Sequence, residues 1–187
     1  RMVEYPTRLF TIPETEWRDW METDYNRTYH LLSYILMFFA FAMIGWFWEV
    51  ALHIIQTGDI VNRGVLYGPW LPIYGCGGVL ILLLMRRFAK WPVLTFFLII
   101  LVCGVLEYGT AWILETFLGT KWWDYSGFFL NLHGRICAEG LLIFGVGGCA
   151  ILYIIAPILD ELFSRVPKKI RTIVAVVLIV CFAADTA

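Results

Sequence analysis

The stretch VLTFFLIILVCGVLEYGTAWILETFL, residues Val93–Leu118, decides the class of this fold. A helix of that length rises about 39 Å at 1.5 Å per residue, which exceeds the roughly 30 Å of hydrocarbon in a bilayer. Only Glu107 and Glu115 carry charge within it. The stretch therefore predicts a membrane-spanning helix rather than a helix from the core of a water-soluble protein.

Four further apolar runs extend this prediction to an all-α membrane protein with about five transmembrane helices: Leu31–Ile55, the short Leu71–Met85, Ile136–Ile158 and Ile170–Ala184. The 187-residue chain is 60% hydrophobic, and its formal net charge of -1 gives no electrostatic case for a nucleic-acid partner. We expect residues 31–187 to form a single transmembrane domain. Residues 1–30 mix acids with Trp and Arg, which predicts a cytoplasmic or interfacial segment.

The segment that leads into the second run contains five Gly and two Pro between Gly64 and Gly78. Such a composition does not favour one regular helix from the start. It predicts an irregular, re-entrant segment before the second spanning helix, which a membrane tolerates only where the backbone is buried in protein or lines a polar cavity.

Basic residues predict the orientation. They follow the second run and separate the fourth from the fifth: Arg86, Arg87, Lys90, Arg165, Lys168, Lys169 and Arg171. Because basic loops stay in the cytoplasm, both connections and the N-terminus are expected inside. The connections at 56–70 and 119–134 then lie on the outer side.

Ionisable residues inside the apolar runs are the main indication of function, because each costs several kcal/mol in hydrocarbon unless it finds a partner. Glu49, Glu107 and Glu115 fall in the outer half, as do Arg135 and Glu139, which are four residues apart in the predicted fourth helix. Shared burial in one polar cavity would offset the penalty, with Arg63 and Arg135 as partners for two carboxylates. The excess of carboxylates predicts a protonated group or a bound cation, although a purely structural network also fits.

Two outer segments add hydrogen-bonding groups to this constellation. Asn62 and Arg63 begin a Gly-rich stretch running to Tyr74, which combines a guanidinium with free backbone amides. The second segment runs from Trp122 to Arg135, and in it we expect Asp124 to pair with Arg135 or Arg63. The complete set of candidate substrate-binding residues is Glu49, Asn62, Arg63, Tyr74, Glu107, Glu115, Asp124, Asn131, Arg135 and Glu139.

Known catalytic and cofactor motifs are absent from the sequence. The five Cys form no CxxC pair, and the metal candidates Glu49, His53 and His133 are a weak set without an HExxH motif. No Walker A loop, nucleophile elbow or dinucleotide fingerprint occurs, so the chain carries no ATPase motif and no cofactor is named. Whether it is an enzyme stays open.

The motifs become recognisable when they are joined. They are GWxxE at 45–49, NRGxxxGPxxPIYG at 62–75, Glu107 and Glu115, WDYS at 123–126, and NLxGRIC at 131–137. From Leu31 to Asp185 the chain resembles the bacterial membrane proteins labelled "putative ABC-transporter permeases" of the CmpB type. The resemblance implies a multi-pass permease of the bacterial inner membrane that works with a separate ATPase subunit. His133 stands where the family has Asn in its Asn-Leu-Asn-Gly-Arg motif, so a role for that middle residue does not carry over.

Three hypotheses follow. The leading one is a permease-like protein with a charged substrate or ion site in the outer half of the bundle, where a homodimer would add a second wall. The alternative is a membrane-embedded enzyme that acts on a lipid-linked or amphiphilic substrate at the outer leaflet, with Glu and His as acid and base groups. The third is an assembly subunit whose polar network only holds its helices together.

Overall fold

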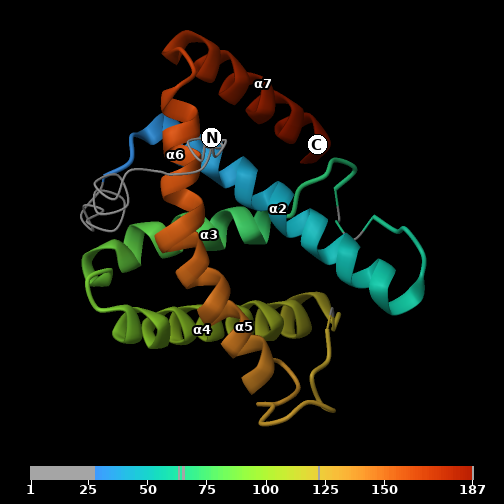
Figure 1. The fold of residues 1–187 in the computed structure, drawn as a ribbon. Helices are drawn as coiled ribbons and strands as arrows, with labels where there is room; N and C mark the ends of the chain where they lie inside the picture. Colours follow the sequence, from blue (N-terminus) through green and yellow to red (C-terminus); the bar gives the residue numbers. More distant parts are fainter. Residues whose placement is uncertain (1–27, 63, 65, 122, 187) are drawn as a thin grey trace, which may run out of the picture.

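The computed structural model describes residues 28–62, 64, 66–121 and 123–186, and the regular elements there are all helical. In chain order they are α2 (Leu31–Thr57), α3 (Pro72–Met85), the 3-10 turn η2 (Arg86–Phe88), α4 (Pro92–Leu118), α5 (Ala138–Ala150), the π turn η3 (Ile151–Ile155), α6 (Ala156–Ser164) and α7 (Lys168–Thr186). Figure 1 shows α3 and α4 side by side, with the rod of α5, η3 and α6 crossing them. Residues 1–27 of the predicted N-terminal segment, and Arg63, lie outside the described residues.

Three helical stretches in the described part of the chain are long and apolar enough to cross a membrane: Leu31–Ile55, Pro92–Leu118 and Ala138–Ser164. They confirm the first, third and fourth predicted spans, and the last of them starts two residues later than expected. The five-span count is not confirmed. Helix α3 has 14 residues, about 21 Å, which is shorter than the hydrocarbon core. Helix α7 has 19 residues, but its first turn contains Lys168, Lys169 and Arg171. The apolar part that remains is shorter than a typical membrane-spanning helix.

The glycines of the 64–78 segment have a different role from the predicted one. Helix α3 already begins at Pro72, and Gly75 and Gly78 lie inside it, so the re-entrant prediction is not confirmed there. A Cβ at Gly75 would meet the backbone oxygen of Phe38 at 2.7 Å, and one at Gly78 would meet the ring of Phe41. The glycines therefore allow α3 to approach α2 closely, as small residues do between membrane helices.

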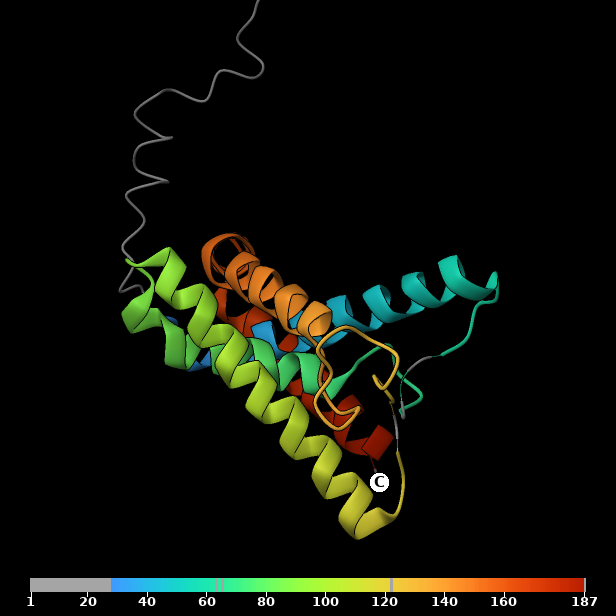
Figure 2. The same cartoon turned by 90° about the horizontal axis from the view of Figure 1, so that it is seen from below.

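Helices α4 and α5 also meet through glycines. Gly104 of α4 faces Leu141, Gly145 of α5 faces Ile100, and Gly148 faces Ile99. Residue numbers fall along α4 as they rise along α5 in these contacts, so the two helices pass each other in roughly opposite directions. Figure 2 shows α5 beside the N-terminal half of α4. Ile99 is fully buried where α3, α4 and α5 converge.

The C-terminal end of α7 is fastened to the segment that precedes α3. The carboxylate of Asp185 accepts hydrogen bonds from the backbone N–H groups of Gly68 (2.8 Å) and Tyr67 (3.0 Å) and from the indole N–H of Trp70 (2.8 Å). Trp70 is buried and packs edge-on against the rings of Phe39 and Phe182. The carboxylate of Asp185 thus satisfies three hydrogen-bond donors of the irregular segment before α3 and links this segment to the end of α7.

The Asp185→Asn variant should lose the acid-sensitive part of this contact. The hydrogen bonds from Gly68, Trp70 and Tyr67 hold the pKa of Asp185 below its ordinary value. A carboxyl with a lowered folded-state pKa stabilises the fold above its unfolded pKa, near 3.9, and loses that stabilisation as pH falls through the folded value. Between about pH 4 and pH 2 we therefore expect the thermal unfolding midpoint of the wild type to fall by several degrees more than that of the variant.

Asp59→Asn is the matched control, because Asp59 is exposed and lies outside this contact. It should follow the wild type across the same pH series. If Asp185→Asn also follows the wild type at every pH, the Asp185 contact does not form in solution.

Candidate functional site

Two carboxylates from different helices each accept a hydrogen bond from a tyrosine hydroxyl. Glu49 of α2 accepts a hydrogen bond from the hydroxyl of Tyr74 on α3 (2.6 Å), and Glu107 of α4 accepts one from the hydroxyl of Tyr125 (3.0 Å). Burial, and then the charge of Glu107, raise the pKa of Tyr125, and the charge of Glu49 raises it further. The phenol therefore stays protonated and donates at neutral pH. We call Glu49, Tyr74, Glu107 and Tyr125 the paired-carboxylate cluster.

The second oxygen of Glu107 is the unsatisfied atom of this cluster. Oε2 is buried and has no hydrogen-bond partner, while Oε1 holds Tyr125. Among the residues that the structure describes, neither Glu107 nor Glu49 forms a salt bridge with Lys or Arg. A buried carboxylate oxygen without a donor is costly unless it carries a proton or meets a cation. The arrangement can therefore hold a proton or accept a positively charged group.

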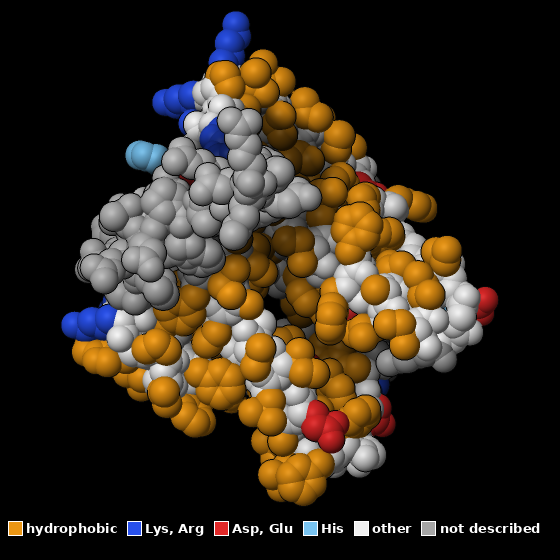
Figure 3. Space-filling view, viewed as in Figure 1, with side chains coloured by type: hydrophobic (Ala, Val, Ile, Leu, Met, Phe, Trp, Pro, Cys, Tyr) orange, Lys and Arg blue, Asp and Glu red, His pale blue; other side chains and the backbone are white. Residues whose placement is uncertain are grey.

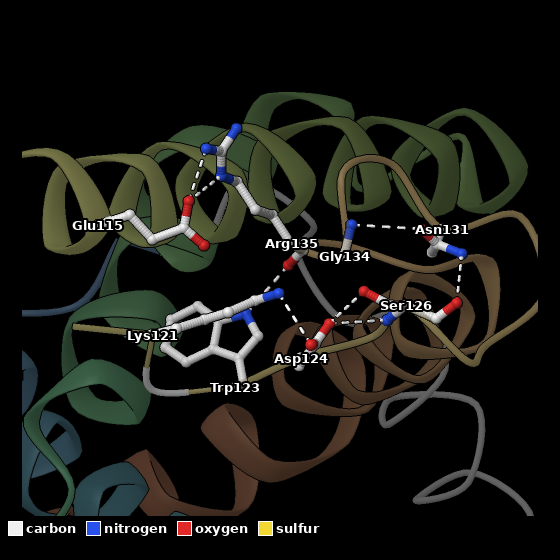
Figure 4. Close-up of polar contacts among 8 residues, drawn as sticks. All are labelled: Glu115, Lys121, Trp123, Asp124, Ser126, Asn131, Gly134 and Arg135. Carbon is white, nitrogen blue, oxygen red and sulfur yellow. Dashed lines mark hydrogen bonds and ion pairs between the residues drawn. The ribbon is translucent and has the colours of Figure 1, made fainter. Parts of the chain in front are cut away.

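Arg135 is fully engaged elsewhere. Its Nη2 and Nε donate to Oε2 of Glu115 at 2.6 and 3.0 Å (Figure 4). Its Nη1 donates to the hydroxyl of Tyr108 at 2.9 Å. The hydrogen bond to Glu115 raises the pKa of Arg135, so the guanidinium remains charged. Tyr108 also bonds to the imidazole of His133 (2.9 Å). Of the two arginines predicted to neutralise carboxylates, Arg135 thus pairs with Glu115, and Arg63 lies outside the described residues.

Asp124 pairs with Lys121 and not with Arg135, and its other predicted partner, Arg63, lies outside the described residues. Asp124 forms a salt bridge with Lys121 (2.9 Å) and accepts hydrogen bonds from the hydroxyl and backbone N–H of Ser126. The hydrogen bonds from Ser126, and then Lys121, lower the pKa of Asp124 to about 2. The predicted pairing of Asp124 with Arg135 is wrong, because the guanidinium points toward Glu115 on the opposite side (Figure 4).

The predicted helical pair Arg135 and Glu139 is also wrong. Helix α5 begins at Ala138 with Cys137 as its N-cap, so Arg135 belongs to the preceding loop. Glu139 lies exposed in the first turn of α5, where a carboxylate favours the positive end of the helix dipole.

The remaining predicted residues serve the loops. The side-chain oxygen of Asn62 accepts from the indole of Trp46 (2.8 Å) and from the N–H of Gly64 (3.0 Å). Asn131 donates to the carbonyls of Ser126 and Phe128, both at 3.1 Å, and accepts from the N–H of Gly134. Both asparagines therefore shape the irregular segments, and the structure places neither in the paired-carboxylate cluster.

A metal centre gains no support from the described residues. Within them, no three His, Cys, Asp or Glu side chains gather as they would around a metal ion. His133 bonds to Tyr108 on α4, whereas Glu49 and His53 belong to α2.

Tyr108 and Tyr125 are the contributors that the sequence did not single out. Tyr108 lies seven residues before Glu115, which is two helical turns and the same face, so this spacing was the available signal. Tyr125 comes from a loop and carries no comparable periodicity. Its position depends on the way the 119–137 segment folds back on α4.

The predicted common cavity for the carboxylates stays a prediction. A groove of about 390 Å³ lies instead between α2, α3 and α7, and its lining is apolar: Leu31, Tyr34, Ile35, Phe38, Phe39, Val79, Ile179 and Phe182. None of the predicted site residues lines this groove.

Comparison with known proteins adds one finding. The family model described as "Putative ABC-transporter type IV" matches residues 36–187, which includes α2 from its sixth residue, all the later helices and the whole paired-carboxylate cluster. No curated protein and no solved structure matches the chain.

Proposed function

Because the chain belongs to the family described as "Putative ABC-transporter type IV", we propose that it is the permease-like component of a membrane transport system and that the paired-carboxylate cluster is its substrate or ion site. The membrane part of this proposal rests on the family and on three apolar helices of spanning length. The position of the site rests on the chemistry of Glu49 and Glu107.

Glu107 carries the proposal. It lies 15 residues into the 27-residue helix α4, and one of its oxygens is buried without a donor. A carboxylate in that position is retained in membrane proteins where it exchanges protons or contacts a substrate. The carboxylate of Glu49 and the two tyrosine hydroxyls add acceptors, so a cation or a proton is the species that this site favours.

The contrast with Glu115 argues against a purely structural network. Glu115 accepts two hydrogen bonds from Arg135, both at Oε2, and the guanidinium balances its charge. Glu107 lies on the same helix, two turns away, has no Lys or Arg partner among the described residues and keeps Oε2 buried without a donor. A network that only held helices together would give both carboxylates a cation.

The charge distribution favours a cytoplasmic position for the N-terminus of α4. Lys and Arg side chains gather toward one side of the molecule and acids toward the other, with apolar surface between them (Figure 3). Arg86, Arg87 and Lys90 precede α4, so the positive-inside rule assigns that end to the cytoplasm of a bacterial inner membrane. The paired-carboxylate cluster then lies in the outer half of the bundle. Energy would come from a separate ATPase subunit, and a homodimer would enclose the site further.

Native mass spectrometry of the purified protein tests the site. We expect the wild type to retain a small cationic species, and the Glu107→Gln variant to lose it entirely because the amide removes the negative charge while keeping the shape. Glu161→Gln is the matched control, since Glu161 is an exposed carboxylate on α6 paired with Arg165. It should retain the species as the wild type does.

An empty wild-type protein would contradict the proposal if Glu107→Gln then differed from it only in thermal stability. A species that survives in Glu107→Gln but disappears from Arg135→Ala would place the site at the Arg135–Glu115 pair instead.

A further inference from the structure

Residues 119–121 and 123–137, which we call the outer hairpin, turn back along α4 instead of projecting from it. Tyr125 reaches Glu107, which lies 11 residues before the end of α4 at Leu118, and Arg135 reaches Tyr108, which lies ten residues before that end. Eleven residues of helix correspond to about 16 Å. The hairpin therefore covers the last three turns of α4.

The start of α5 gives the depth of the hairpin independently. Leu141 of α5 faces Gly104 of α4, and the helices run in opposite directions, so Ala138, three residues earlier, lies near the level of Glu107. The backbone N–H of Ala138 donates to the carbonyl of Phe129 (3.2 Å). The tip of the hairpin is thus attached at the level of Glu107, well below the end of α4.

That level lies inside the hydrocarbon core. Helix α4 starts at Pro92, next to Lys90, whose ammonium lies 4.1 Å from the centre of the Trp91 ring, a pairing typical of a membrane interface. Glu107 is 15 residues further on, about 22 Å or less if the helix is tilted, whereas the hydrocarbon core is roughly 30 Å thick. The tip therefore lies several ångströms short of the opposite boundary.

The backbone of the outer hairpin makes several internal hydrogen bonds, which favour such a depth. Irregular backbone is tolerated in a membrane only if its polar groups find partners in the protein. Tyr125 N–H donates to Gly134 O (2.8 Å), and Leu132 N–H donates to Ile136 O (2.9 Å). Further bonds come from Asn131 to the carbonyls of residues 126 and 128, and from the Trp123 indole to Arg135 O (3.0 Å). These bonds satisfy part of the hairpin backbone within the hairpin itself and so lower the cost of placing it in hydrocarbon.

The side chains at the tip have the composition that lipid favours. Phe128, Phe129 and Leu130 are 49%, 68% and 71% exposed, and the stretch from Gly127 to Leu132 contains no charged residue. Leu130 is held at a φ of +48°, a conformation unusual for a bulky residue. In water, this arrangement would expose three large apolar side chains at a loop tip, whereas the hydrocarbon core removes that cost.

We propose that the outer hairpin is a re-entrant element whose tip, Phe128–Leu130, contacts the acyl chains of the leaflet opposite Arg86 and Lys90. The partner is the lipid bilayer, because the depth of the tip matches hydrocarbon and its exposed side chains are apolar, as are the exposed Val105 and Trp112 of α4. The inference depends on the membrane-spanning position of α4 and α5 and is independent of the proposed substrate site.

Photocrosslinking tests the position of the tip. The full chain carries p-benzoyl-L-phenylalanine in place of Phe129 and is reconstituted in vesicles of phosphatidylethanolamine and phosphatidylglycerol. After irradiation, mass spectrometry should find a phospholipid adduct at residue 129 with a yield equal to that of the same probe at Phe97, an exposed residue inside α4. The probe at Asp59, an exposed residue beyond the end of α2, should yield many-fold less.

A yield at residue 129 as low as that at residue 59 would overturn the proposal, as would a crosslink to a second copy of the chain. Phe128, which is 49% exposed, takes the probe if the variant at residue 129 does not fold.

Discussion

Replacing Gly75 by Ala lowers the free energy of unfolding by about 1–3 kcal/mol, the usual cost of inserting a methyl group into a filled contact. The added Cβ would stand 2.7 Å from the backbone oxygen of Phe38 and 2.8 Å from its ring. A ring can rotate away, but the backbone oxygen moves only if α2 moves with it. The contact between α2 and α3 must therefore open, and with it the hydrogen bond between Glu49 and Tyr74 that joins these helices.

Gly77→Ala is the control for this prediction. Gly77 lies two residues further along α3, and a Cβ there would meet nothing within 4 Å. Ala favours a helix over Gly by up to about 1 kcal/mol, so Gly77→Ala should leave stability unchanged or raise it. Titration with sodium dodecyl sulfate, followed by circular dichroism, measures both variants. Equal losses from the two changes would show that α3 does not pack against α2 through Gly75.

Arg135→Ala lowers the thermal unfolding midpoint by several degrees and loosens the outer hairpin. The change leaves the carboxylate of Glu115, whose side chain is 26% exposed, without its cation, and removes the donor to Tyr108. An unpaired and partly buried charge destabilises more than the pair stabilises. The reaction of a thiol dye with Cys137, which is 2% exposed and two residues away, reports this unfolding.

Two companion variants separate charge from geometry. Adding Glu115→Gln to Arg135→Ala should recover part of the midpoint, because the double variant no longer holds an unpaired charge. Arg135→Lys should have a thermal unfolding midpoint below that of the wild type. One ammonium does not reproduce the planar guanidinium that donates to Glu115 and Tyr108 together. Additive losses in the double variant would mean that Arg135 and Glu115 are not coupled.

The sequence predicted the helical spans well because their signal is local. Leu31–Ile55 matches the structure at both ends, and the α4 span differs by one residue. In both cases length and hydropathy suffice, because a helix satisfies its own backbone whatever surrounds it.

The glycines of α3 show where local signals fail. Gly75 and Gly78 suggested a broken helix, since glycine weakens helices in isolation. In the structure the same residues permit contact with Phe38 and Phe41 of α2, more than 30 residues earlier in the chain. No short window of sequence contains both partners, so the same composition fits either role.

Pairing among the charged residues had the same difficulty. The four-residue spacing of Arg135 and Glu139 indicated a pair on one helix, but α5 begins at Ala138 and Arg135 pairs with Glu115, 20 residues away. The predicted site residues did include Glu49 and Glu107. Of their two tyrosine partners, Tyr74 was among the predicted site residues and Tyr125 was not.

The sequence by itself determined that this is a helical membrane protein with acids within or beside its apolar helices, while only three of the five predicted spans are confirmed by the structure. These properties follow from the cost of exposing backbone and charge to hydrocarbon, which each segment meets on its own. Only the tertiary structure decided which carboxylate is paired and which is open. Arg135 reaches Glu115 and leaves Glu107 to Tyr125 because the outer hairpin folds back along α4, and that path depends on contacts between residues far apart in the chain.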